Sequence, residues 1–234
     1  MSQPHPRGPQ LARLASLLAD ETRASFCLAL LDGRAWTAGE LARLAGVAAS
    51  TASEHLSRLV EGGLLAEERQ GRHRYVRLAG PQVAQLIEDL SGHAAPPPAP
   101  RTLRAASAGE AMARARTCYD HLAGRLGTAI TDAMVEHGLL RGAEGFALTD
   151  VGLAWFRRLG VDLSAASRGR RPMARSCLDW TERRPHLAGV AGAALCRHAL
   201  DAGWCARIGS QRALRVSEEG RRALRDLLGV RLPE

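Results

Sequence analysis

Four prolines within five residues, Pro96–Pro100, interrupt this 234-residue chain. Proline has no amide hydrogen and fixes its own backbone angle, so neither a helix nor a central strand continues through such a segment. A run of this kind favours an extended polyproline spacer. The sequence therefore predicts two separately folded parts, a domain over 1–93 and a domain over 105–234, joined by a proline-rich linker over 94–104.

The first part shows short helices and one β-hairpin. Apolar residues at a three-to-four spacing predict helices over about 11–18, 20–31, 37–45, 49–61 and 81–92. Asp20 is positioned to cap the second helix, and the segment T-A-G-E at 37–40 forms a capping box for the third. Between the last two helices, Leu64–Glu68 and His73–Leu78 alternate as strands around a turn that contains Gly71.

This order of elements is that of a winged helix-turn-helix. The helix after the turn carries small polar residues at its start, which suit base edges in the major groove of DNA. Arginines at the hairpin tip suit the phosphate backbone or a minor groove. The pattern therefore predicts DNA binding through the helix at 49–61 and the hairpin.

Residues 19–79 resemble the ArsR/SmtB family of bacterial transcriptional regulators. Four segments carry the resemblance: A-D-E-T-R at 19–23, E-L-A at 40–42, V-A-A-S-T-A-S-E-H-L-S-R-L at 47–59, and G-G-L-L with G-R-H-R-Y-V-R-L between 62 and 78. The resemblance implies a homodimer that pairs through its first and last helices, here around 9–18 and 81–92. It also implies repression of a double-stranded DNA operator, relieved by an effector.

The positions that match the family's recognition helix and wing are the candidate DNA contacts. They are Ser50, Thr51, Ser53, Glu54, His55 and Arg58 in the helix, and Arg72, His73 and Arg74 in the wing. Each has a structural alternative. Ser50 and Thr51 can cap the helix, His55 can pack against the turn, and Arg58 can be a solvated surface residue.

The family's metal sensors place a C-x-C pair in the helix before the recognition helix. Here that helix reads E-L-A-R-L-A-G and contains no cysteine. The last helix also lacks a convincing Asp/His set, since it offers only Glu88, Asp89 and His93. We therefore expect no metal response through the first domain.

The second part contains an internal repeat, predicted over about 118–162 and 183–230. The motif H-L-A-G at 121–124 recurs at 186–189, and L-T-D-V-G at 148–152 matches V-S-E-E-G at 216–220. Each copy is expected to hold a helix, a glycine stop, a short hairpin and a helix capped by Thr149 or Ser217. One long helix is expected from about Ala105 to His137, ending at Gly138.

Neither copy has enough apolar surface for a core of its own, so the two are expected to pack together. The predicted fold is mainly α with small β-hairpin wings: a winged helix-turn-helix followed by a pseudo-symmetric α/β-hairpin repeat domain. Trp155 and Trp204 are expected in its core, whereas Trp180 lies outside the repeat pattern and is the better candidate for contact with a ligand.

An effector, if one is sensed, is expected to bind the second domain. The candidates for effector or redox contact are Cys118, His121, Cys177, Asp179, Trp180 and His186. Cys118 and His121 are three residues apart on the expected helix and would share a face. Thiolate, imidazole and carboxylate groups suit a zinc-like metal or a redox-responsive thiol. Buried structural cysteines and a packing role for both histidines are the alternatives.

The formal charge of +8 comes from 32 arginines and 24 acidic residues, without a single lysine. Residues 1–93 hold ten arginines and ten acidic residues, so the whole surplus belongs to the second part. One basic segment there, R-G-R-R-P-M-A-R at 168–175, can contact flanking DNA, hold an anionic ligand or simply connect the repeats.

The leading prediction is a sequence-specific transcriptional regulator, a homodimeric repressor released by an effector or redox signal. The sequence has no phosphate-binding glycine motif, G-x-S-x-G or H-E-x-x-H, so no enzyme and no required cofactor are expected. Two alternatives stay open: an enzyme with a Cys/His site in the second domain, and a non-specific architectural DNA binder. Without a secretory signal or a bilayer-length apolar run, a cytoplasmic location without membrane contact is expected.

Overall fold

The computed structural model describes residues 5–71, 73–95, 99, 102–142, 145–163, 171–208 and 212–232. The chain forms two compact units, residues 1–87 and 88–234. The boundary falls inside helix α5 (Pro81–His93). The four prolines on which the predicted linker rests lie outside the described residues.

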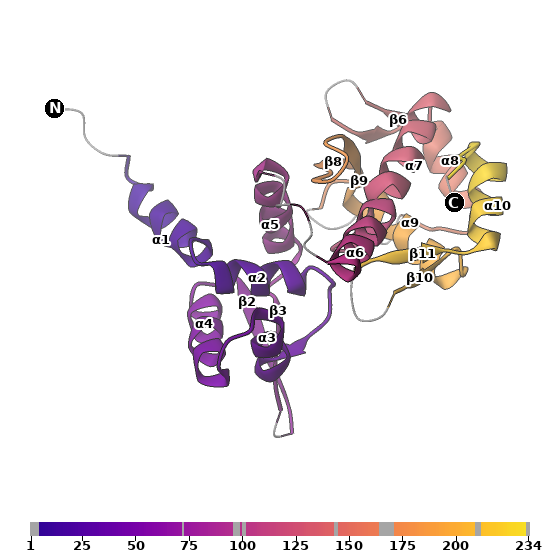
Figure 1. The fold of residues 1–234 in the computed structure, drawn as a ribbon. Helices are drawn as coiled ribbons and strands as arrows, with labels where there is room; N and C mark the ends of the chain where they lie inside the picture. The colour runs from indigo at the N-terminus through magenta and orange to yellow at the C-terminus, as the bar shows by residue number, and fades with distance from the viewer. Residues whose placement is uncertain are drawn as a thin grey trace. The chain divides into compact units, whose positions relative to one another are not determined.

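The first unit is a winged helix-turn-helix, as predicted. Its elements are α1 (Gly8–Leu18), α2 (Glu21–Leu30), β1 (Trp36–Thr37), α3 (Ala38–Ala45), α4 (Ala49–Glu61), β2 (Leu65–Gln70), β3 (His73–Leu78) and the start of α5. The strands form one antiparallel sheet in the order β1-β3-β2. The β2–β3 hairpin projects away from the helices of this unit (Figure 1).

Local capping explains where these helices begin and end. The side chain of Asp20 accepts a hydrogen bond from the backbone N–H of Arg23, as predicted for the second helix. Thr37 and Glu40 form the predicted capping box of α3. That helix ends at Gly46, whose φ of 67° lies in the left-handed region that glycine adopts without strain. These caps set the turn that separates α3 from α4.

The hairpin is longer than predicted, because β2 continues to Gln70 and pairs with His73. The turn is then only two residues long, and its first residue, Gly71, has a φ of 58°. The short strand β1, which the sequence does not signal, pairs Trp36 with Val76 and closes the sheet. A core of buried apolar residues joins helices and sheet; its members include Phe26, Leu30, Leu41, Leu56, Leu59 and Val76.

The second unit repeats one order of elements: hairpin, helix, hairpin, helix. The first copy consists of β4 (Arg116–Cys118), β5 (His121–Ala123), α7 (Gly124–Glu136), β6 (Leu140–Arg141), β7 (Ala147–Leu148) and α8 (Asp150–Arg158). The second consists of β8 (Arg175–Leu178), β9 (Pro185–Ala188), α9 (Gly189–Asp201), β10 (Cys205–Arg207), β11 (Leu214–Val216) and α10 (Glu218–Leu228). Helix α6 (Leu103–Arg114) precedes both.

The predicted single helix from about Ala105 to His137 is wrong. Helix α6 ends at Arg114, and the β4–β5 hairpin stands between it and α7. A tight turn at Tyr119, with a φ of 57°, closes this hairpin. The backbone N–H of Gly124 then donates to the distant carboxylate of Asp179, so a long-range contact overrides the local helical spacing.

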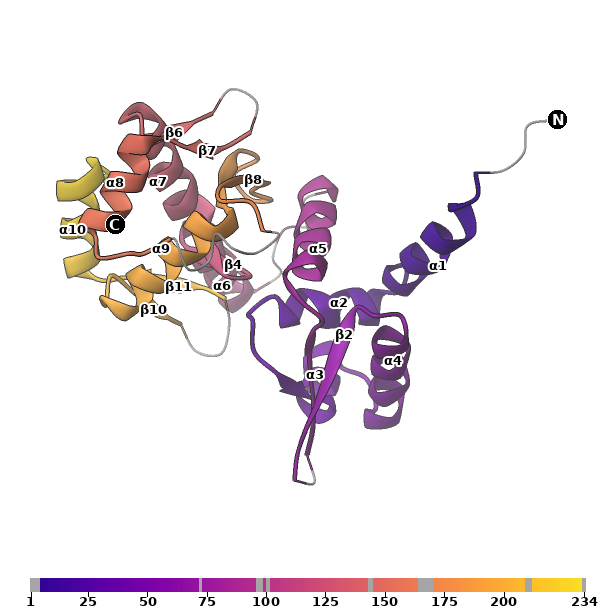
Figure 2. The ribbon, with the colours of Figure 1, turned by 180° about the vertical axis from the view of Figure 1, so that it is seen from behind.

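Each copy accordingly starts earlier than predicted, at Arg116 and Arg175, because an additional hairpin opens it. The predicted caps at Thr149 and Ser217 are confirmed, since each side chain accepts from a backbone N–H three residues later. Helix α10 packs against α7 (Figure 2). Trp155 and Trp204 are buried in the shared core, as predicted.

The two copies interlock, because α7 packs on β9 and α9 packs on β5. A glycine on each helix permits a close approach to the strand before it. A Cβ atom at Gly127 would lie 2.4 Å from the carbonyl oxygen of Leu122, and one at Gly192 would lie 2.4 Å from that of Leu187. This packing brings the first hairpins of the two copies together.

Candidate nucleic-acid interface and a buried Cys/His cluster

Helix α4 presents a polar face opposite its packed face. Ala52, Leu56 and Leu59 are buried against the unit. Of the candidate DNA contacts, Ser50, Glu54 and Arg58 are exposed, and Thr51 is half-buried. No side chain caps the start of this helix, so the capping alternative for Ser50 and Thr51 is not what the structure contains. The exposed face therefore keeps its polar groups available for a ligand.

His55 instead lies against α2. Its Nδ1 is 3.3 Å from Nη1 of Arg23 and 3.8 Å from the carboxylate of Asp20, and its side chain is only 16% exposed. The guanidinium of Arg23 also donates to the backbone oxygens of Ser16 and Leu17. The backbone N–H of Arg23 holds the pKa of Asp20 below its usual value. This network ties α1, α2 and α4 together.

Ser53 is also engaged within the unit, since its hydroxyl donates to the backbone oxygen of Ala49 at 2.9 Å. Hydroxyls that bond back to the preceding turn in this way are common inside helices. Among the predicted contacts of the recognition helix, Ser53 and His55 are thus the two that the fold itself uses.

The wing places arginines beside glutamates. Arg74 donates to Glu67 at 2.8 Å, and Arg69 donates to the same carboxylate at 3.0 Å. The hydrogen bond from Arg69 lowers the pKa of Glu67 below its usual range. His73 is exposed, and Arg72 lies outside the described residues. Phosphate contact by Arg74 would therefore exchange a carboxylate partner for a phosphate.

In the second unit, the first hairpins of the two copies bring two cysteines and two histidines together. Cys118 pairs with His121 across β4 and β5, and Cys177 pairs with His186 across β8 and β9. The predicted shared helix face for Cys118 and His121 is wrong, but the tight hairpin makes them neighbours. One ligand atom from each of the four residues lies within 4.8 Å of all the others, and all four side chains are buried.

The two thiols are in direct contact, with their Sγ atoms 3.7 Å apart. The hydrogen bond from Cys118, with help from both histidines, lowers the pKa of Cys177 to about 2, whereas burial raises the pKa of Cys118. Burial disfavours the charged imidazole of His121, but Asp120 and Cys177 outweigh it and raise the pKa of this side chain. Cys118 and the two histidines thus stabilise the thiolate form of Cys177.

Each histidine has a carboxylate beside its Nδ1, but only His121 and Asp120 form a hydrogen bond, and Nδ1 of His186 has no hydrogen-bond partner in the described part of the chain. Nδ1 of His121 lies 3.3 Å from Asp120, and Nδ1 of His186 lies 3.4 Å from Asp179. The buried Nε2 atoms of both rings have no hydrogen-bond partner among the described residues. Neither histidine caps the following helix, because both lie in strands.

Asp179 is the centre of a buried polar network. Its carboxylate accepts from Arg116 at 2.9 Å, and also from Thr181, the N–H of Glu182 and the N–H of Gly124. Both Asp179 and Arg116 are 0% exposed at their side chains. Burial raises the pKa of Asp179, but Arg116 and the other donors more than offset this and hold it well below its usual range.

Trp180, the candidate for ligand contact, stacks instead on a cation of its own unit. The guanidinium carbon of Arg116 lies 4.6 Å from the centroid of its ring. Of the basic segment at 168–175, residues 168–170 lie outside the described residues. Arg171 forms a two-point ion pair with Asp120, at 2.5 and 2.9 Å.

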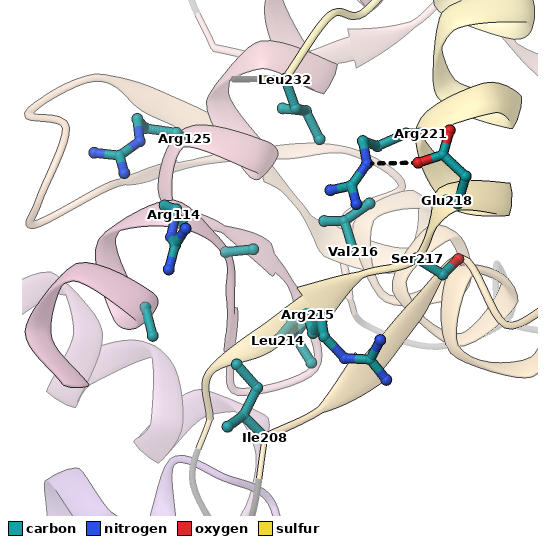
Figure 3. Close-up of a pocket in the computed structure, with 12 residues that line it drawn as sticks. Arg114, Arg125, Ile208, Leu214, Arg215, Val216, Ser217, Glu218, Arg221 and Leu232 are labelled. Atoms are coloured by element: carbon teal, nitrogen blue, oxygen red, sulfur yellow. Dashed lines mark hydrogen bonds and ion pairs between the residues drawn. The ribbon is translucent and has the colours of Figure 1, made fainter. Parts of the chain in front are cut away.

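A pocket that the sequence does not signal lies between α6, β11 and α10. Its volume is about 470 Å³. Its lining, drawn in Figure 3, combines arginines from three helices and a strand with apolar side chains that include Leu214, Val216 and Leu232. The arginines are Arg114, Arg125, Arg215 and Arg221. Arginines scattered over the sequence converge only through the fold, so no local motif could have revealed the site.

Two of these arginines already have carboxylate partners. Arg221 pairs with Glu218 (Figure 3), and Arg125 pairs with Glu110. Arg114 and Arg215 form no ion pair within the described part of the chain. The pocket thus joins an apolar surface to uncompensated positive charge.

The chain is similar to known regulators. Residues 18–68 match a family model for a helix-turn-helix domain. The chain is 41% identical over 225 residues to the uncharacterized HTH-type transcriptional regulator YdfF of Bacillus subtilis (strain 168). The aligned region covers 96% of this chain and 99% of YdfF. The chain is 39% identical over 84 residues to the HTH-type transcriptional regulator CmtR of Mycobacterium tuberculosis, 36% of this chain and 70% of CmtR.

Solved structures show similarity over a smaller part of the chain. The NMR structure of the cadmium metal-sensor CMTR from Mycobacterium tuberculosis aligns at 34% identity with a TM-score of 0.32, covering 39% of this chain and 96% of that one. Within the described residues, no helix combines the length and apolar character needed to cross a membrane.

Proposed function

Because the chain belongs to the ArsR/SmtB family of winged helix-turn-helix transcriptional regulators, we propose that it represses a specific operator as a homodimer and releases it when an effector binds the second unit. The observation that carries the DNA-binding role is the exposed polar face of α4. Ser50, Glu54 and Arg58 lie on this face, opposite the buried leucines of the same helix. Helix α4 enters the major groove, where such side chains contact base edges.

The wing supplies contacts with DNA that do not depend on the base sequence. Arg72 and Arg74 approach phosphates, with Glu67 giving up Arg74 when DNA binds. Loss of one phosphate contact lowers the slope of log K against log salt by about 0.9. A salt titration of Arg72→Ala and Arg74→Ala tests this role, and an unchanged slope removes the wing from the interface.

The test of specific binding is a mobility-shift assay on DNA upstream of the chain's own gene, with random competitor DNA in excess. Arg58→Ala is expected to weaken specific binding by about 5- to 150-fold, the range of one base contact worth 1–3 kcal/mol. Arg222→Ala, which removes an exposed arginine from α10, is the control and should leave binding unchanged. Complexes that random DNA removes completely would instead indicate a non-specific architectural binder.

Dimerisation is proposed through α1, which is amphipathic but has no buried residue in the monomer. Leu11 on this helix is 68% exposed. A second copy of the chain would cover Leu11 and the rest of the apolar face of α1. Leu11→Glu is expected to give a 25 kDa monomer in light scattering, whereas Leu103→Glu, which alters another exposed leucine, should leave the dimer intact. A monomeric wild-type chain would refute the proposal.

The pocket of Figure 3 is the proposed effector site, and its chemistry fits a small organic anion with an apolar body. Anilinonaphthalene sulfonate is a suitable fluorescent probe, because it combines both features. Arg114→Ala and Arg215→Ala are expected to weaken its binding at least tenfold, while Arg222→Ala should have no effect. Equal binding to all variants would exclude this pocket.

The Cys/His cluster does not favour the enzymatic alternative. A nucleophilic Cys118 or Cys177 must reach a substrate, but both side chains are 1% exposed. His121 and His186 are 4% and 0% exposed. The known relatives are transcriptional regulators, which accords with a structural rather than a catalytic role for the cluster.

A further inference from the structure

We propose that Cys118, His121, Cys177 and His186 form a four-coordinate site for a divalent d¹⁰ metal ion of the zinc type. The site does not depend on the DNA-binding role, and it lies in a different unit from the family's C-x-C position. Two thiolates and two imidazoles are the donor set of many structural zinc sites. They come from equivalent positions of the two copies, one Cys/His pair from each first hairpin.

The distances fit this coordination. Zinc–sulfur bonds of about 2.3 Å in a tetrahedron place the two sulfur atoms about 3.8 Å apart. The Sγ atoms of Cys118 and Cys177 are 3.7 Å apart. All four donor atoms lie within 4.8 Å of one another, so small side-chain rotations complete the tetrahedron without movement of the strands.

Unpartnered nitrogen atoms on both imidazole rings, three in all within the described residues, point to a ligand. A buried polar atom without a partner costs about 1–3 kcal/mol, and native structures contain few of them. Here the two Nε2 atoms, at equivalent positions of His121 and His186, are both buried and unsatisfied. A metal ion between them would satisfy both at once.

The groups behind the histidines are those of a metal site. Metal-bound histidines usually donate their other ring N–H to a carboxylate, which orients the ring. Asp120 takes this place at His121 by a hydrogen bond to Nδ1, and at His186 the carboxylate of Asp179 lies 3.4 Å from Nδ1 without a hydrogen bond between them. Each carboxylate is held by an arginine in turn, Asp120 by Arg171 and Asp179 by Arg116.

The surroundings indicate a structural ion rather than a catalytic one. Around the sulfur atoms, Ala123 and Ala188 complete a small buried apolar cluster. All four donors are protein side chains, which leaves no open position for a substrate. The ion would cross-link the two hairpins and so hold the copies together.

A disulfide between Cys118 and Cys177 fits less well. It requires the sulfur atoms to approach to about 2.05 Å, and they are 3.7 Å apart. It would also leave both Nε2 atoms without a partner. The metal ion accounts for all four side chains, whereas the disulfide accounts for two.

The test uses the full chain, purified without a histidine tag under reducing conditions. Elemental analysis is expected to find one zinc ion per chain. Co²⁺ added to the metal-free protein should give the visible absorption of tetrahedral cobalt and a thiolate charge-transfer band. Cys118→Ser should lose both signals. Cys196→Ser, which alters another buried cysteine of the same unit, should keep them.

A conservative variant covers the case in which Cys118→Ser does not fold. Asp120→Asn keeps all four donors and is expected to weaken zinc binding by about 10- to 100-fold in competition with a chelator. The proposal is overturned if the wild-type chain binds no Zn²⁺ or Co²⁺. It is also overturned if Cys118→Ser binds them as the wild type does, or if mass spectrometry finds a Cys118–Cys177 disulfide in metal-free protein prepared without oxygen.

Discussion

Replacing Arg116 by methionine tests whether the buried ion pair supports the second unit. The guanidinium is 0% exposed and donates to Asp179, to the hydroxyl of Thr181 and to the backbone oxygen of Met112. Methionine keeps much of the volume beneath Trp180 but removes every donor. Asp179 would then be a fully buried carboxylate without its arginine counter-charge.

The expected loss of stability is large for a single substitution. Removing one partner of a buried pair typically costs about 3–5 kcal/mol, because the other charge stays desolvated. The hydrogen bonds that Asp179 keeps from the Thr181 hydroxyl and three backbone N–H groups place the expected cost near the lower end, about 3 kcal/mol. For a unit of this size, that corresponds to a fall in the melting temperature of about 6–12 °C.

The assay is urea unfolding followed by circular dichroism, with Arg184→Met as the matched control. Arg184 pairs with Asp132 in the same unit, but both side chains are about half exposed, and such pairs contribute about 0–1 kcal/mol. Arg116→Met should therefore lower the free energy of unfolding by at least about 2 kcal/mol more than Arg184→Met. Equal effects of the two substitutions would refute the role assigned to the buried pair.

Two further substitutions test local elements. The backbone N–H of Thr37 holds the pKa of Glu40 below its usual value. The Glu40 carboxylate therefore stabilises the first unit fully at any pH above the pKa that it has in the unfolded chain, and this stabilisation is lost as the pH falls through the lower pKa of the folded state. Glu40→Gln should thus be less stable than wild type at neutral pH, with the difference vanishing on acid titration; a constant difference would contradict the capping box. Gly127→Ala should cost about 1–3 kcal/mol in thermal unfolding, because its Cβ would overlap the oxygen of Leu122. Gly109→Ala, in open space on α6, should be neutral or stabilising, and equal effects would disprove the close helix–strand approach.

The first unit could be predicted closely because its signals are local. Asp20, the T-A-G-E box and Gly46 act within one turn of the residues that they cap. The hairpin is likewise set by alternation and by one glycine. What sequence alone did not reveal is that His55 packs against Arg23, because that contact joins two helices 32 residues apart.

The second unit was less accessible to sequence reasoning. The repeated H-L-A-G motif correctly indicates two copies, but the apolar spacing around it predicts a helix that the structure does not contain. The apolar positions with this spacing belong to three elements, α6, the β4–β5 hairpin and α7, and the hairpin buries consecutive residues, Arg116 to Cys118. Long-range contacts, such as those of Gly124 with Asp179 and of Thr117 with Arg212, distinguish the two possibilities.

Local signals in the chain specify the helix-turn-helix, the wing and the two related copies, because caps, glycines and periodicity act over a few residues. The remaining features arise from tertiary packing. Cys118 meets Cys177 across 59 residues, and four arginines from separate elements line one pocket. Such sites depend on how helices pack on distant strands, here through glycines that admit a backbone oxygen at close range. Packing of that kind is a property of the whole unit and leaves no local pattern.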